Sequence, residues 1–464
     1  MDTEVSRFRR LFLFFVLYAA LSIACHVQAE EFTDLPPLPK GPLLLTSVTP
    51  EQFSPDYWIR RMPDASQVLK TPEELKKFNE DIHFMIKDCV DIFKADAARA
   101  GKPVREQMEL EYRAVGGRIL YGADGKRIPK EIFIQDIRPL MQTDKVPGRI
   151  KMKWGVAVRQ ASIRALPSEV KMLEQVGDIE FDQLQFTQIK LWTPVGIYHT
   201  SKNGKWLYVQ APYSRGWIRA KDVAFFSSRD EIKKKVKTGR FLVVTGESIP
   251  VYADENLTKR YQRPSMGTIL PLRRKTASAY EIWVPVRQPD GSVRLKTAYV
   301  SLKSDVSEGF LPYTKRNIVR QAFKLLGARY GWGGIYNGRD CSGFTHDVFL
   351  TLGVEMPRDS KGQGFIGTQI DHFEYKEDTE RKLAALRAST PGLTLLRMPK
   401  HQMLYLGEVN GQFYVIHCTW AERISMTSDE KNRINQVVVS DLNLNGKSHL
   451  GSLFDRIISI SEIN

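Results

Sequence analysis

"GGIYNGRDCSGFTHDVF", residues 333–349, places four glycines around the triplet Asp340-Cys341-Ser342, just ahead of an apolar run. Core cysteines usually stand among aliphatic residues, whereas Cys341 stands where a loop becomes a helix. We predict a helix over 341–352 with Asp340 as its N-cap. Unpaired backbone N–H groups and the positive end of the helix dipole are expected to lower the pKa of Cys341 from about 8.5 toward neutrality or below. This stretch therefore predicts a nucleophilic thiolate.

Two histidines downstream supply the groups that such a nucleophile needs. His401 opens the predicted strand "HQMLYLG", and His417 closes its partner "YVIHCTW". A base and a residue that orients it complete a Cys-His-X triad. His346 lies on the predicted helix of Cys341 itself, and we expect it to point away and to be structural. The predicted triad is Cys341, His401 and His417, and it requires no metal or cofactor.

The turn between the two histidine strands decides whether the rings can meet. A regular two-residue turn at Asn410-Gly411 would leave His401 and His417 on opposite faces, because side chains alternate along a strand. We therefore predict an odd-length or bulged turn, which makes the two histidines diagonal neighbours on one face. Cys418 would then project from the opposite face, away from the nucleophile.

Four segments in chain order, "RYGWGGIYNGRDCSGF", "MPRDSKGQG", "PKHQMLYLG" and "YVIHC", resemble the NlpC-type cell-wall cysteine peptidases, which have a papain-like core. The upstream part resembles the subgroup with an N-terminal stabilising segment and two bacterial SH3-like barrels. The resemblance implies an endopeptidase that cuts peptidoglycan stem peptides between γ-D-glutamate and diaminopimelate, or lysine. Two rival hypotheses remain: an amidase or acyltransferase on the same core, and a wall-binding protein whose cysteine site is inert.

Carried over by position, the resemblance assigns a role to each site residue. Cys341 is the nucleophile, His401 the general base and His417 its orienting partner. A free peptide N-terminus, the amine of L-Ala, is expected to meet an acid of the catalytic domain together with a tyrosine and an acid of the first barrel. The expected substrate-binding residues are Tyr330, Asp340, Ser342, Asp359 and Ser360 of the catalytic domain and Tyr213 and Asp182 of the first barrel.

The sequence departs from the family pattern in two places. Lys400 stands where a glycine usually precedes the catalytic histidine, and "YSRGW" is one residue longer than the spacing expected before the "GW" of the barrel. A cation at position 400 would disfavour protonated His401 or would meet a carboxylate of the substrate.

The hydrophobic period changes along the chain and divides it into parts. A Pro-rich start leads into a helical region, with one helix predicted over 71–94 and Cys89 on its buried face. Two blocks of short β-type runs follow, and their openings "VAVRQASI" and "LVVTGESI" match loosely. Helices and an antiparallel meander close the chain. The predicted fold is multidomain: a signal peptide (1–29), an N-terminal stabilising, largely helical segment (30–149), SH3-like barrels (150–228 and 238–308) and a papain-like α+β catalytic domain (312–464).

The first 29 residues indicate export. A basic start, an apolar stretch over 11–24 and the small-residue site "VQA" are typical of a signal peptide. We expect the periplasm or cell envelope, with an extracellular location or a lipoprotein anchored through Cys25 as alternatives. The net charge of +15 would attract anionic wall polymers, or it reflects solubility alone. The expected partners are peptidoglycan-derived peptides; we expect no nucleic acid, membrane attachment only if Cys25 is lipidated, and a monomer.

Overall fold

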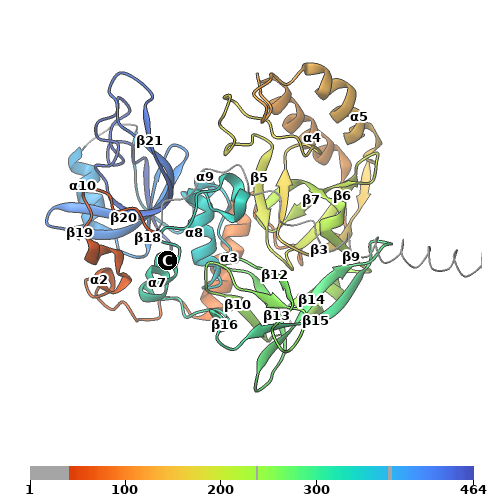
Figure 1. Cartoon of the computed structure of the whole chain (residues 1–464), viewed down its shortest axis with the longest axis horizontal. Coiled ribbons are helices and arrows are strands. Elements are labelled where there is room, and N and C mark those ends of the chain that lie inside the picture. Colours follow the sequence, from red (N-terminus) through yellow and green to blue (C-terminus); the bar gives the residue numbers. More distant parts are fainter. Residues whose placement is uncertain (1–40, 237–238, 375–378) are drawn as a thin grey trace, which may run out of the picture. The chain divides into compact units, whose positions relative to one another are not determined.

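The computed structural model describes residues 41–236, 239–374 and 379–464 (Figure 1). The predicted signal peptide and Cys25 lie outside the described residues. Within them, no helix combines the length and the apolar character that a membrane span needs. The fold is multidomain, with a largely helical N-terminal segment, two β-rich barrels and a C-terminal α+β domain.

The N-terminal segment contains one long helix whose end differs from the prediction. Helix α3 begins with the predicted capping box at Thr71, but it stops at Met85 because the chain turns to the first barrel, where the Val90 N–H donates to the Pro212 carbonyl (2.7 Å). Cys89 lies beyond the helix and is nevertheless buried (3% exposed). The elements are η1 (Pro50–Phe53), α2 (Pro55–Ile59), α3 (Pro72–Met85), β1 (Ala98–Ala100), α4 (Gly101–Gly116), η2 (Ile132–Ile137), α5 (Arg138–Met141), η3 (Thr143–Lys145) and β2 (Arg149–Lys151), which pairs with β1.

Within the described residues, each barrel is a seven-stranded antiparallel sheet, and the two share one topology. The first has the order β5-β4-β8-β7-β6-β3-β9 and the second β12-β11-β15-β14-β13-β10-β16, which is the same order when strands are counted from the start of each barrel. This agreement confirms the internal repeat. The first barrel contains β3 (Lys153–Ala157), β4 (Ala161–Arg164), β5 (Gln185–Ile189), β6 (Pro194–Thr200), β7 (Trp206–Ala211), β8 (Ser214–Arg219), η4 (Ala220–Asp222) and β9 (Val223–Phe226); α6 (Arg229–Val236) follows; the second contains β10 (Phe241–Val244), β11 (Val251–Tyr252), β12 (Arg260–Gln262), β13 (Ile269–Lys275), β14 (Ala279–Arg287), β15 (Val293–Ser301) and β16 (Val306–Glu308).

The C-terminal domain packs helix α8 on one face of an antiparallel sheet with the order β17-β22-β18-β19-β20-β21 (Figure 1). Phe344 and Val348 of α8 share a buried core with Leu404 of β19 and Ile416 of β20. The elements are α7 (Lys315–Phe323), η5 (Trp332–Asn337), α8 (Cys341–Leu350), α9 (Ser360–Gln363), β17 (Thr368–His372), α10 (Thr379–Ala388), β18 (Thr394–Met398), β19 (His401–Val409), β20 (Gln412–Arg423), β21 (Lys431–Asp441) and β22 (Ser459–Glu462).

The β19–β20 hairpin reaches the predicted register by a different route. Its turn is a regular two-residue one, with φ values of 52° at Asn410 and 77° at Gly411, so the predicted odd-length or bulged turn is wrong. The irregularity lies inside β19 instead, where the register shifts between Tyr405 and Gly407. A one-residue shift exchanges the faces of a strand. The two histidines therefore lie on the same face, as predicted.

Candidate active site

The nucleophile candidate Cys341 is the first residue of α8, at the end of a glycine-rich loop. Asp340 is the N-cap, and its carboxylate accepts a hydrogen bond from the Gly343 N–H (2.7 Å). The thiol Sγ lies 3.9 Å from the carbonyl oxygen of Lys400, at the start of β19. The loop-to-helix transition that the sequence predicts therefore places the cysteine beside the strand that carries His401.

The ionisation of Cys341 differs from the prediction. Burial raises the pKa of the thiol to about 12, Asp340 adds to this, and the Gln402 N–H and Arg358 lower it only in part. The side chain is 9% exposed. Desolvation and the neighbouring carboxylate thus outweigh the helix N-terminus, so in this closed site Cys341 is a thiol and not a thiolate.

The two histidines form a chain of hydrogen bonds that ends at a serine. Nε2 of His401 lies 2.7 Å from Nδ1 of His417, and Nε2 of His417 lies 3.0 Å from Oγ of Ser440 on β21. Burial lowers the pKa of His401 to about 3 and the pKa of His417 well below its ordinary value, so both rings are neutral. Because Nε2 of His401 is occupied by His417, the nitrogen left to take a proton is Nδ1.

The part of the chain that the structure describes contains no hydrogen bond between Sγ of Cys341 and the ring of His401; Sγ is instead near backbone groups, the Lys400 carbonyl and the Gln402 N–H among them. Catalytic hydrogen bonds are often long before substrate binds and tighten in the complex. Ser440 was not predicted from the sequence. It sits on a strand that follows His417 in the chain, and only the pairing of β20 with β21 brings it to the ring.

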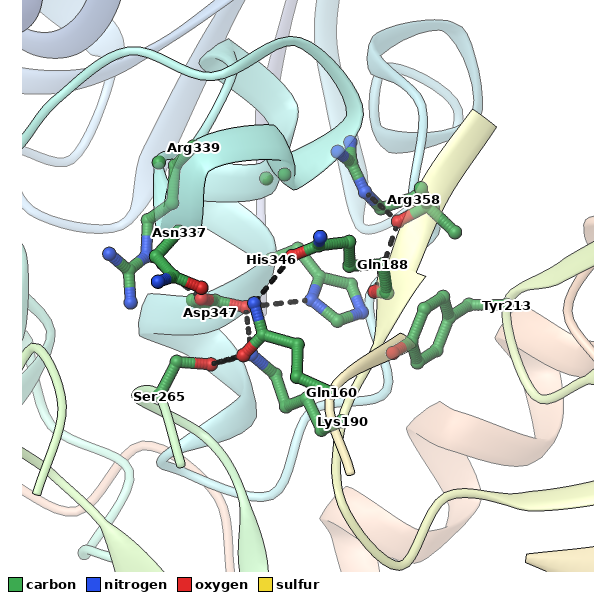
Figure 2. A pocket seen from close by; sticks show the side chains of 14 residues that line it. Gln160, Gln188, Lys190, Tyr213, Ser265, Asn337, Arg339, His346, Asp347 and Arg358 are labelled. Carbon is green, nitrogen blue, oxygen red and sulfur yellow. Dashed lines mark hydrogen bonds and ion pairs between the residues drawn. The ribbon is translucent and has the colours of Figure 1, made fainter. Parts of the chain in front are cut away.

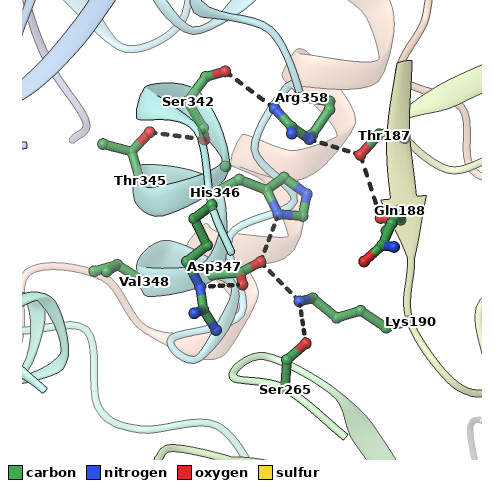
Figure 3. Close-up of polar contacts among 12 residues, drawn as sticks. Thr187, Gln188, Lys190, Ser265, Ser342, Thr345, His346, Asp347, Val348 and Arg358 are labelled. Atoms are coloured by element: carbon green, nitrogen blue, oxygen red, sulfur yellow. Dashed lines mark hydrogen bonds and ion pairs between the residues drawn. The ribbon is translucent and has the colours of Figure 1, made fainter. Parts of the chain in front are cut away.

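Asp340 and Ser342, expected to contact substrate, are held by Arg358, which the sequence analysis missed; Figure 3 shows its contacts with Ser342 and Thr187. Nη2 and Nη1 of Arg358 lie 2.7 and 2.9 Å from the two carboxylate oxygens of Asp340, and Nη1 is also 3.1 Å from Oγ of Ser342. Nε of Arg358 donates to Thr187 in the first barrel (2.7 Å). Burial alone would raise the pKa of Asp340, but Arg358 and backbone N–H groups lower it. Arg358 thus links the cap of α8 to β5.

The other predicted residues of the catalytic domain fall into two environments. Tyr330 is buried against Phe181 of the first barrel, and burial, with Asp340 and Cys341 nearby, raises its pKa. Asp359 is exposed and caps α9, with Oδ1 accepting from the Gly362 N–H (2.9 Å). Its Oδ2 accepts no hydrogen bond within the described residues. Ser360, the first residue of α9, is half-buried.

The two residues predicted from the first barrel make contacts that do not involve Asp359. Asp182 is enclosed, and its carboxylate is used by Arg164 (2.9 Å) and by the N–H groups of Met172 and Leu184. The ring of Tyr213 packs edge-on against His346, with 4.5 Å between centroids.

His346 is buried, and its Nδ1 lies 3.3 Å from Asp347, which agrees with the structural role predicted for it. Asp182 is therefore buried within the first barrel, and Tyr213 packs against α8.

The structure also shows the surroundings of Lys400, which precedes β19, and of Cys418 on β20. Lys400 has a φ of 62°, in the left-handed region that glycine adopts most easily, which explains why a glycine suits this position. Cys418 projects from the face opposite His417, as predicted. That face is covered by α8, and Sγ of Cys418 donates to the carbonyl of Arg339 (2.9 Å), shortly before the nucleophile. The prediction that Cys418 lies away from Cys341 is therefore wrong.

Comparisons with known proteins identify the same two modules. Residues 327–442 match the NlpC/P60 family, and residues 172–219 match an SH3 domain of the SH3b1 type. The chain is 25% identical over 209 residues to the gamma-D-glutamyl-L-lysine dipeptidyl-peptidase of Bacillus cereus (strain ATCC 10987 / NRS 248). That match covers 45% of this chain and 57% of the relative, so the chain spans a little over half of the relative's length.

A solved NlpC/P60 endopeptidase from Photobacterium damselae subsp. piscicida superposes with a TM-score of 0.72 at 17% identity, covering 91% of this chain and 99% of that one. This likeness shows a shared fold over nearly the whole described chain. The chain therefore contains an NlpC/P60 domain, preceded by a bacterial SH3 domain of the SH3b1 type.

Proposed function

We propose that the protein is an exported cell-wall cysteine peptidase that cleaves stem peptides between γ-D-glutamate and diaminopimelate or lysine. The observation that carries the proposal is the position of Cys341 at the start of α8, beside the strand whose His401 is hydrogen-bonded to His417. The NlpC/P60 match and the name of the Bacillus relative support a peptidase of this class.

The proposed reaction uses two half-reactions. Sγ of Cys341 attacks the carbonyl carbon of the scissile amide while Nδ1 of His401 takes the thiol proton. Backbone N–H groups at the start of α8 stabilise the oxyanion. His401 then gives the proton to the departing amine, which leaves a thioester on Cys341. Water, deprotonated by His401, attacks the thioester and releases the γ-D-glutamyl acid and the thiol.

His417 acts by fixing the ring of His401. A neutral imidazole has one N–H, so a base at Nδ1 of His401 requires the proton on Nε2, which donates to Nδ1 of His417. His417 then carries its own proton on Nε2, which donates to Ser440. The geometry of this chain therefore supports one protonation pattern, with the lone pair of His401 on the nitrogen that His417 does not use.

Asp359 supports recognition of a free peptide N-terminus. It is exposed, and its Oδ2 has no partner within the described residues, so it can accept an ammonium group. Tyr213 and Asp182 add no support, because the one packs on His346 and the other is paired with Arg164.

Comparison of L-Ala-γ-D-Glu-diaminopimelate with its N-acetylated form tests this recognition. We expect a lower kcat/KM for the blocked peptide and a larger loss for wild type than for Asp359→Asn. Equal values for the free and blocked peptides would contradict it.

Incubation of the mature protein with defined muropeptides, read by mass spectrometry, tests the activity itself. Release of free diaminopimelate or lysine, or of a peptide beginning with it, is expected. Cleavage between the sugar and L-Ala would indicate an amidase, and transfer to an added amine without net hydrolysis would indicate an acyltransferase. Binding to wall fragments without any turnover would favour the non-catalytic alternative.

A further inference from the structure

A second buried polar cluster lies on α8, beyond the first turn that carries Cys341. Asp347 is its centre, with one carboxylate oxygen 2.8 Å from Nζ of Lys190 and the other 2.8 Å from Nε of Arg339 (Figure 3). Nζ of Lys190 is also 3.2 Å from Oγ of Ser265, which belongs to the second barrel. The cluster thus brings together both barrels and the helix of the nucleophile.

The charges in this region do not balance. Lys190, Arg339 and Arg358 are cations, whereas Asp340 and Asp347 are the carboxylates that face them. Arg358 is paired with Asp340, so Lys190 and Arg339 share the single carboxylate of Asp347. The side chains involved are at most 12% exposed.

His346 does not change this balance of charges. Burial lowers its pKa, so the ring is neutral, and burial likewise lowers the pKa of Lys190, with Arg339 and Arg358 acting in the same direction. While Lys190 is protonated, three cations face two carboxylates in a region that water reaches poorly, which is costly unless an anion is close, and the lowered pKa of Lys190 reflects the same cost.

A cavity of about 40 Å³ opens beside this cluster (Figure 2). Such a volume holds about three water molecules or one small ion. Two hydrogen-bond donors that line it lack acceptors among the described residues: Nη1 of Arg339, whose residue is 4% exposed, and the buried hydroxyl of Tyr213. Cys341, His401 and Asp359 do not line it, so the cavity is separate from the nucleophile.

We propose that this cavity is a binding site for one small monovalent anion, chloride or a carboxylate of the size of formate. The anion supplies the missing negative charge and accepts from Nη1 of Arg339, which has no acceptor among the described residues. Because Lys190 comes from the first barrel and Ser265 from the second, the bound anion stabilises the junction between the barrels and α8. The anion has two possible sources: a free ion, which fits the cavity volume, or the carboxylate of a wall peptide, which has the same chemistry.

Crystals of the mature protein grown in sodium bromide test the site directly. An anomalous peak inside the cavity, within hydrogen-bond distance of Nη1 of Arg339, is expected. A cavity that holds only water in bromide would overturn the proposal.

Thermal unfolding in solution gives an independent test at constant ionic strength. Replacing gluconate, which has the same charge but is too large for the cavity, by formate or chloride should raise the Tm with saturation. Equal Tm values in the three salts would contradict the site.

Variants then assign the effect to the cluster. Lys190→Met removes the excess cation and should abolish the formate-dependent rise in Tm, whereas Lys190→Arg keeps the charge and should retain it. Lys205→Met, which removes an exposed lysine of the same barrel, is the matched control and should behave as wild type. If formate raises the Tm of Lys190→Met as much as that of wild type, the anion does not bind at this cluster. If Lys190→Met does not fold, the bromide crystals and the salt comparison in wild type still test the site.

A final arm distinguishes the sources of the anion. The dipeptide L-Ala-γ-D-Glu is added to the Cys341→Ala variant at saturating formate. A further, additive rise in Tm places the peptide elsewhere and makes a free ion the occupant. Rises that are not additive, so that formate no longer changes the Tm at saturating peptide, make the peptide carboxylate the occupant.

Discussion

The first turn of α8 and the turn that follows both bury polar side chains, but Cys341 at the first turn is neutral and Asp347 at the second is ionised. At the first turn, burial holds Cys341 as a thiol, and on neighbouring β19 it holds His401 as a neutral ring. Further along the helix, Asp347 stays ionised because Lys190 and Arg339 contact it. The difference teaches that ionisation here follows the partners of a group and not its distance from the helix N-terminus. The neutral pair Cys341 and His401 can exchange a proton. The ion pairs of Asp347 connect the helix to the barrels.

Loss of the nucleophile is the largest effect expected at the first turn of α8. Cys341→Ala should lower kcat/KM by at least about 10⁴-fold, because the proposed thioester forms on this thiol. Its Tm should stay close to that of wild type, since the side chain lies at the edge of the core. Cys89→Ala is the matched control, and it should keep activity while losing about 1–3 kcal/mol of unfolding free energy. Residual turnover in Cys341→Ala would remove the cysteine from the mechanism.

The pH dependence of alkylation tests the neutral state of Cys341. Burial raises the pKa of this thiol to about 12, so the thiolate fraction should grow about tenfold per pH unit across pH 6–9, without a plateau. The rate constant for iodoacetamide, measured by mass spectrometry of the Cys341 peptide, should rise by about 10³-fold over that range. A rate that levels off near neutrality would show that the helix N-terminus does generate a thiolate.

The buried ion pair between Arg358 and the N-cap Asp340 should respond most in stability. Arg358→Gln leaves the buried carboxylate of Asp340 without its partner and should lower the unfolding free energy by about 3–5 kcal/mol. Arg423→Gln breaks an exposed pair with Asp429 and should cost less than about 1 kcal/mol. Denaturant unfolding of the two variants makes the comparison. Similar costs for both would mean that the Arg358 pair does not fasten α8.

A smaller loss of rate is expected from the residue that orients the base. His417→Ala should lower kcat by about 10²-fold with little change in KM, because the ring of His401 loses its partner at Nε2. Ser440→Ala should lower it less, since that serine touches only His417. A His417→Ala enzyme with wild-type kcat would place this histidine outside the catalytic set.

Local features of the sequence allowed much of the site to be predicted. The N-cap aspartate before Cys341 and the capping box at Thr71 act over a few residues. The start of α8 and of α3 could therefore be predicted from neighbouring residues in the sequence. The repeated order of β-type runs likewise indicated two barrels of one topology. The register of the histidine strands could be inferred as well, because only one phase puts both rings on the same face.

Features that depend on distant segments could not be predicted in this way. After α3 the chain makes a hydrogen bond from Val90 to Pro212 in the first barrel, and the register shift in β19 appears only in its pairing with β20. Arg358 reaches the cap of α8 only after folding, and the same burial reverses the pKa shift expected for Cys341. A helix N-terminus can be recognised in a sequence, but the degree of desolvation around it cannot.

Capture of the acyl-enzyme tests the central claim most directly. The purified protein is mixed with L-Ala-γ-D-Glu-diaminopimelate, quenched in acid within the first turnover, and digested for peptide mass spectrometry. The account predicts a mass increase equal to L-Ala-γ-D-Glu, less one water, on the peptide that contains Cys341, and none in Cys341→Ala. Cleavage of the substrate with no adduct at Cys341 at any time point, or an adduct on Cys89 or Cys418, would contradict it.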